Sequence, residues 1–215
     1  MTTYNFIAIE GNIGAGKTTL ASGLANDFEA RLVLEEFADN SFLPKFYSEP
    51  DKYAFPLELS FLAERYHQLK TELVRQDIFK PRIVADYYFL KSLIFAKANL
   101  DEDEYLLYSK LFHIINDSLP KPDLFVYLYH DIERLQENIK KRGRTYEQNI
   151  SDEYLMKIQT AYFDFMKQAS DLRVLIVDVN NVDFANNRQH YKQMLNIISK
   201  PYDVGITRIT AINVT

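Results

Sequence analysis

The stretch that most constrains this chain is its opening, FIAIEGNIGAGKTTLA, which spans residues 6–21. Four of its residues, Gly11, Gly16, Lys17 and Thr18, satisfy the pattern G-x-x-x-x-G-K-[ST] between an apolar run and a helix-like segment. Glycines let backbone N–H groups approach phosphate oxygens, the lysine reaches the outer phosphates, and the threonine hydroxyl suits Mg²⁺. The pattern therefore predicts an ATP-Mg²⁺ site made of Gly11, Asn12, Ile13, Gly14, Ala15, Gly16, Lys17, Thr18 and Thr19.

Short apolar runs recur along the rest of the chain, with longer helix-like segments between them. The runs predict strands at 6–10, 31–36, 82–88, 123–129 and 173–179, and the segments predict helices at 17–28, 53–79, 89–118, 131–141, 152–169 and 184–199. The intervening lengths suit crossover helices rather than hairpins. We expect one α/β domain over residues 1–200 with a parallel sheet of about five strands. The tail, 201–215, is either an added strand or a segment that lies over a neighbour.

Composition narrows the range of partners. The chain has 215 residues, no cysteine and a net charge of −5, and 47% of its residues are hydrophobic, which disfavours disorder. No block of Lys and Arg is long enough to follow a nucleic-acid backbone, and no window reaches the ~18 apolar residues of a membrane helix. We therefore expect small-molecule partners and a second copy of the chain, no nucleic acid, no membrane, and a cytoplasmic location.

Acidic residues follow two of the predicted strands, where ligands of parallel sheets bind. Asp86 follows the third run, and Glu35 and Glu36 follow the second. Neighbouring strands lie about 4.8 Å apart, so an acid one strand from the glycine-rich loop could bind Mg²⁺ through water. An acid two strands away would lie roughly where a hydroxyl group that accepts the γ-phosphate is expected. This predicts Asp86 for the metal and Glu36 for the proton of the hydroxyl. The alternative is that both glutamates only solvate the strand end.

The acceptor's charge can also be inferred. The segment LEEFADN, residues 34–40, offers three acids and no base. A monophosphate acceptor would require arginine there, so the segment favours a neutral acceptor.

Together with the later KKRGRTYEQ, residues 140–148, these motifs resemble the deoxynucleoside kinases, and most closely their bacterial deoxyguanosine/deoxyadenosine kinase branch. The resemblance covers about residues 4–199. It implies a P-loop kinase fold with strand order 2-3-1-4-5, a short arginine-bearing lid at about 141–150, and a homodimer. It also implies that ATP phosphorylates the 5′-hydroxyl of a deoxynucleoside, in deoxynucleotide salvage.

The resemblance assigns roles to individual positions. Glu36 is the general base, Tyr47 contacts the sugar 3′-hydroxyl, and Glu147 is the partner of that tyrosine. Arg142 and Arg144 are the lid arginines that stabilise the transferring phosphoryl group. Tyr47 could instead be one more packed aromatic, and the basic residues could complement a helix end capped by Gly143.

The loop over the adenine is a weaker match. The resemblance places Asp183 and Phe184 there, in DVNNVDF. An ordinary turn capped by Asn or Asp would have the same sequence.

Two positions depart from the family pattern. Many members have an acid-Arg-Ser triplet where this chain has Asp86, Tyr87 and a second tyrosine, so the charge of that arginine must come from the lid or from Lys91. Many members also use a glutamine to hydrogen-bond the edge of the substrate's nucleobase. This chain has Glu58 at that position, seven residues before Arg65. A carboxylate only accepts hydrogen bonds, which favours a purine, guanine over adenine. The alternative is an internal Glu58–Arg65 ion pair.

Two other functions compete with a deoxynucleoside kinase. A thymidylate-type nucleoside-monophosphate kinase shares the phosphate loop, but the acidic acceptor strand and the Tyr47/Glu147 pair disfavour it. A non-catalytic nucleotide-binding switch would not need the proposed base or the lid arginines. The histidines have no spacing that suggests metal binding or catalysis, and we interpret them as structural.

Overall fold

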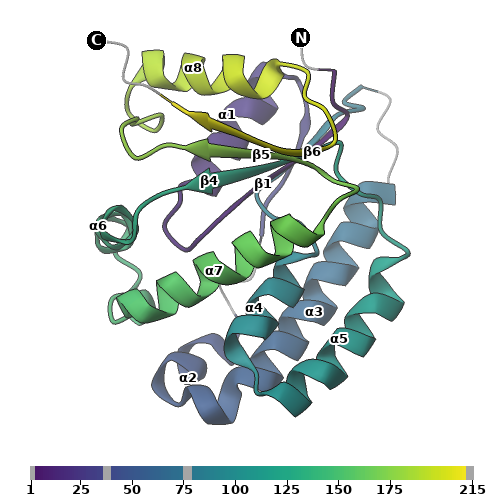
Figure 1. Ribbon diagram of the computed structural model, residues 1–215, viewed down its shortest axis with the longest axis vertical. Coiled ribbons are helices and arrows are strands. Elements are labelled where there is room, and N and C mark those ends of the chain that lie inside the picture. Colours follow the sequence, from purple (N-terminus) through teal and green to yellow (C-terminus); the bar gives the residue numbers. More distant parts are fainter. Residues whose placement is uncertain (1–2, 36–39, 75–78, 212–215) are drawn as a thin grey trace.

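The computed structural model describes residues 3–35, 40–74 and 79–211. Their strands form one fully parallel sheet in the order β2-β3-β1-β4-β5-β6 (Figure 1). The strands are β1 (Phe6–Gly11), β2 (Arg31–Val33), β3 (Ile83–Ala85), β4 (Leu124–Tyr129), β5 (Arg173–Asp178) and β6 (Gly205–Thr210). The predicted α/β class and the order of the first five strands are confirmed.

The predicted number of strands is wrong, because the tail adds a sixth. Strand β6 lies parallel to β5, in a register that runs from Arg173 opposite Gly205 to Asp178 opposite Thr210. Its residues alternate between half-buried and exposed, since β6 is the edge strand. The sequence showed this alternation, but over too few residues to distinguish a strand from a surface segment.

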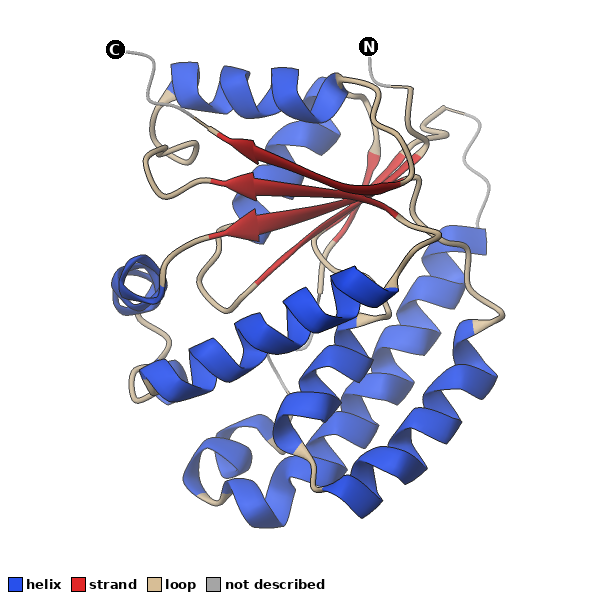
Figure 2. Cartoon of the chain, viewed as in Figure 1, coloured by secondary structure: helices blue, strands red, loops and turns tan. Residues whose placement is uncertain are grey.

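Helices cover both faces of the sheet (Figure 2). Along β1, Ile7 and Ile9 belong to the core on the α1 and α8 side, and Phe6 and Ala8 belong to the core on the α3, α4 and α7 side. The helices are α1 (Lys17–Asp27), α2 (Leu43–Ser48), α3 (Pro50–Val74), α4 (Lys91–Asn99), α5 (Glu102–Asn116), α6 (Ile132–Arg142), α7 (Asp152–Gln168) and α8 (Arg188–Ser199), with a 3₁₀ turn η1 (Thr145–Glu147).

The long helix predicted at 89–118 is two helices, α4 and α5. Leu100 is extended, and the side chain of Asp101 caps α5 by accepting a hydrogen bond from the backbone of Glu104 at 2.8 Å. An Asp before a run of acids is a helix-start signal, which the continuous apolar pattern concealed. Among the described residues, no helix is both long and apolar enough to cross a membrane.

Candidate active site

The glycine-rich loop joins β1 to α1 and adopts a conformation that requires glycine. Gly14 and Gly16 have φ of 82° and 81°, in the left-handed region. A Cβ on Gly16 would also lie 2.9 Å from Cζ of Phe184. Lys17 Nζ donates hydrogen bonds to the carbonyls of Gly11 at 3.0 Å and Asn12 at 2.8 Å. The lysine is thus held at the loop, where the helix N-terminus favours an anion.

Two amides fix the loop to the helices around it. Asn12 Nδ2 donates to the carbonyl of Leu155 on α7 at 2.8 Å. Asn138 Nδ2 on α6 donates to the carbonyl of Gly14 at 2.9 Å. The phosphate loop is therefore anchored to the helix that leads into the predicted lid and to the helix that follows it.

The residues predicted for the metal lie together. Thr18 Oγ1 donates to Asp86 Oδ2 at 2.5 Å, and Asp86 Oδ1 accepts from the backbone N–H of Glu35 at 2.7 Å. A hydroxyl and a carboxylate are the hard oxygen donors that Mg²⁺ prefers, with water and substrate phosphates completing its shell. Among the described residues, no three acids or histidines cluster as a self-contained metal site. The donor set thus fits a magnesium ion that arrives with a nucleotide.

Glu35 lies at the end of β2, two strands from the loop, and is held by two cations. Its Oε1 accepts hydrogen bonds from Arg65 Nε at 3.0 Å and Nη2 at 2.9 Å, and its Oε2 pairs with Lys91. Burial alone would raise the pKa of Glu35, but Lys91 and Arg65 outweigh it and lower this pKa to about 2. The predicted base, Glu36, lies outside the described residues.

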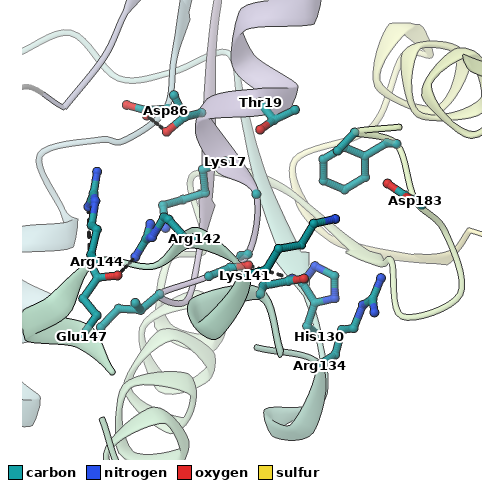
Figure 3. Close-up of a pocket in the computed structure, with 18 of the residues that line it drawn as sticks. Lys17, Thr19, Asp86, His130, Arg134, Lys141, Arg142, Arg144, Glu147 and Asp183 are labelled. Carbon is teal, nitrogen blue, oxygen red and sulfur yellow. Dashed lines mark hydrogen bonds and ion pairs between the residues drawn. The ribbon is translucent and has the colours of Figure 1, made fainter. Parts of the chain in front are cut away.

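The lid arginines lie against the predicted sugar partner. Arg142 pairs with the carboxylate of Glu147, and Arg144 Nη1 lies 3.3 Å from Oε1 of the same carboxylate. Gly143 between them has φ of 74° and ends α6, with its N–H bonded to the carbonyl of Ile139. The helix-end interpretation is therefore correct, and it is compatible with a phosphate role. Figure 3 shows this group beside Lys17.

A first cavity, about 590 Å³, lies over the phosphate loop. The predicted adenine contacts, Asp183 and Phe184, line it. The sequence analysis gave no ligand-binding role to four other residues that line this cavity: His130, Arg134, Asn138 and Lys141. Figure 3 labels His130, Arg134 and Lys141. Burial lowers the pKa of His130 to about 4, so its imidazole is neutral. The three residues on α6 follow a helical spacing that faces the loop, which is the signal that could have revealed them.

A second cavity holds the predicted acceptor residues. Tyr47, Glu58 and Arg65 line it, together with Asn99 and Tyr154, which the sequence analysis missed. Glu58 is 1% exposed, and its Oε1 accepts a hydrogen bond from Asn99 Nδ2 at 2.6 Å. Its Oε2 has no partner among the described residues. Burial raises the pKa of Glu58 to about 7, even though Arg65 opposes the rise.

The alternative interpretation was an internal Glu58–Arg65 ion pair, and the contacts of the described residues do not include one. Arg65 instead donates to Glu35 and, at 3.0 Å, to Ser92 Oγ. Tyr47 stacks on Tyr146 with ring centroids 6.0 Å apart. The tyrosine is therefore packed as an aromatic and also lines the cavity.

The two cavities meet. The residues that line both are Ile13, Glu35, Lys91, Arg144 and Glu147. A group bound by the phosphate loop and a group bound in the second cavity would therefore face each other across two acids and two cations.

Comparison with known proteins agrees with this geometry. The profile of the family described as deoxynucleoside kinase matches residues 7–201. Deoxyguanosine kinase from Bacillus subtilis is 37% identical, covering 90% of this chain and 96% of its own length. Deoxyadenosine kinase from Dictyostelium discoideum is 35% identical, covering 85% and 75%. The structure of deoxyadenosine kinase from M. mycoides with bound dATP has a TM-score of 0.77 at 26% identity, covering 90% and 98%.

The match extends over nearly the whole chain and includes the phosphate loop, the acidic strand ends and the lid. The chain belongs to the deoxynucleoside kinase family, and it is an enzyme of that kinase class.

Proposed function

We propose that this protein transfers the γ-phosphate of ATP, bound with Mg²⁺, to the 5′-hydroxyl of a purine deoxynucleoside. The observation that carries the proposal is the junction of the two cavities at Glu35. On one side lie the phosphate loop, Thr18 and Asp86, and on the other lie Tyr47 and Glu58. Alignment of two substrates across such a junction supplies several kcal/mol of the barrier reduction.

The reaction needs one bond formed and one broken. The 5′-oxygen attacks the γ-phosphorus, the bond between that phosphorus and the β–γ bridging oxygen breaks, and ADP leaves. The hydroxyl proton passes to a carboxylate at the end of β2. Glu35 fits this role because it lines both cavities, whereas the sequence assigned it to the adjacent Glu36. Arg142 and Arg144 release Glu147 in part to contact the phosphoryl oxygens, on which negative charge spreads.

Magnesium would be held by Thr18 and Asp86, directly or through water, together with phosphate oxygens. It would neutralise charge on the β- and γ-phosphates. The short Thr18–Asp86 contact supports this assignment, since one ion can use both oxygens.

The base preference rests on Glu58. Glu58 lines the acceptor cavity at the position where the family pattern has glutamine, and one of its oxygens has no partner among the described residues. As a carboxylate, it can accept from the N1–H and N2–H groups of guanine. The names of two relatives, a deoxyguanosine kinase and a deoxyadenosine kinase, support a purine.

The test offers ATP-Mg²⁺ with each of the four deoxynucleosides and each of their monophosphates, and measures ADP release and product mass. We expect turnover with deoxyguanosine first and deoxyadenosine second. Turnover with monophosphates alone would support a thymidylate-type kinase instead, and nucleotide binding without turnover would support a switch.

The same assay distinguishes the two adjacent glutamates. We expect Glu35→Gln to lower kcat by at least ~10²-fold, the usual contribution of a general base. Loss of rate in Glu36→Gln with a fully active Glu35→Gln would return the role to Glu36.

A homodimer is part of the proposal. Three apolar residues of α5 are exposed: Leu106 and Leu107 at 53% and Ile114 at 77%. Burial of this surface against a second copy would remove it from water. Light scattering on the purified protein measures the mass, and we expect that of two chains.

A further inference from the structure

Lys91 is buried at the junction of the two cavities, in a place that is costly for a lysine. It begins α4, where the helix dipole disfavours a cation, and its side chain is 7% exposed. Its Nζ also lies 5.4 Å from the ring centroid of Phe95. Lysines are rarely buried, and cations are unfavourable at a helix N-terminus. Positions that depart from such local preferences are commonly functional.

Lys91 is only partly neutralised in the structure. Among the described residues, the hydrogen bonds of its Nζ go to Glu35 alone, and an ammonium group has three donors. Lys17 and Lys91 line the same cavity over the phosphate loop. A phosphate group bound in this cavity would therefore meet two cations.

The tyrosine at the position of the family's arginine does not supply the missing charge. Tyr87 is fully buried, and its hydroxyl donates to Gln68 Oε1 at 2.5 Å. Gln68 in turn donates to the carbonyl of Leu34 at 2.8 Å. Tyr87 lines neither cavity and instead holds the segment that carries Glu35.

We propose that Lys91 is a catalytic cation that pairs with Glu35 in the free enzyme and moves to the γ-phosphate of bound ATP, where it takes the place of the absent arginine. This inference rests on the proposed function. The long, flexible stem of lysine allows the ammonium to serve both anions from one position. On the phosphate, Lys91 stabilises the charge of the transferring group. Its departure also frees an oxygen of Glu35 to accept the 5′-hydroxyl proton.

The test compares Lys91→Met, Lys91→Gln and Lys91→Arg, with Lys97→Met as the matched control. Lys97 is an exposed residue of the same helix that lines neither cavity. We expect the Met and Gln variants to lose ~10²- to 10³-fold in kcat, as for removal of one preorganised charge-stabilising donor. The Arg variant should retain a rate within about tenfold of wild type, since it keeps the charge that the role requires. Lys97→Met should retain wild-type kcat.

The outcomes separate this inference from the proposed function. A wild-type enzyme that phosphorylates no deoxynucleoside overturns the function itself. An active wild type, with a kcat of Lys91→Gln within about threefold, overturns only the role of Lys91. If Lys91→Met does not fold, the Gln and Arg variants decide, because both keep hydrogen-bond donors and only one keeps the charge.

Discussion

Glu58 offers a prediction that does not depend on catalysis. Its carboxyl is buried at 1% exposure with one oxygen unpaired, and burial raises its pKa from 4.5 to about 7. The folded protein therefore keeps a proton on Glu58 up to about pH 7, while the unfolded chain loses it near 4.5. Because the folded state binds the extra proton in this window, the free energy of unfolding falls as pH rises from 4.5 to 7.

The size of the effect follows from the shift. Each pKa unit corresponds to 1.36 kcal/mol, so the difference between 4.5 and about 7 amounts to about 3 kcal/mol. Glu58→Gln has no proton to lose at this position. The free energy of unfolding of wild type should thus fall by about 3 kcal/mol more than that of the variant between pH 5 and 8.

Urea denaturation at pH 5, 6, 7 and 8 measures this difference, because other titrating groups are common to both proteins and cancel. Glu153→Gln is the control, since Glu153 is an exposed residue of α7. Parallel pH profiles for wild type and Glu58→Gln would mean that Glu58 is ionised throughout, and would refute the argument from burial.

Three other predictions concern turnover. The ratio of kcat/KM for deoxyguanosine to that for deoxyadenosine should rise with pH through about 7, because a protonated Glu58 can donate to N1 of adenine and a carboxylate cannot; in Glu58→Gln the ratio should be constant. Asp86→Asn should raise the Mg²⁺ concentration for half-maximal rate by roughly tenfold, and an unchanged Mg²⁺ titration would exclude Asp86 from the metal shell. Tyr47→Phe should raise KM for the nucleoside by about 5- to 30-fold, one to two kcal/mol, with KM for ATP unchanged; a shift in the ATP value instead would contradict its placement.

The parts that the sequence could predict are those encoded locally. The phosphate loop is a contiguous pattern whose glycines, lysine and threonine have one physical use, and the buried strands are uninterrupted apolar runs. Asp86 could be placed beside Thr18 because parallel strands bring their carboxyl ends to one edge.

The rest depends on contacts between distant segments. Glu35 and Arg65 lie 30 positions apart, and Glu35 and Lys91 lie 56 apart, so no local pattern distinguishes Glu35 from its neighbour as the residue at the junction. The pairing of β6 with β5 likewise depends on an edge that only the folded sheet provides. The pairing of both lid arginines with Glu147 required the geometry of α6 and η1.

The central claim is that the 5′-hydroxyl of the deoxynucleoside binds beside a carboxylate at the end of β2, in line with the γ-phosphorus of ATP. A crystal structure with deoxyguanosine and a non-hydrolysable ATP analogue measures this directly. We predict the 5′-oxygen within hydrogen-bond distance, about 2.6–3.2 Å, of a Glu35 oxygen, with Lys91 Nζ on the γ-phosphate. A nucleoside bound elsewhere, or a 5′-oxygen remote from both Glu35 and Glu36, would contradict the account.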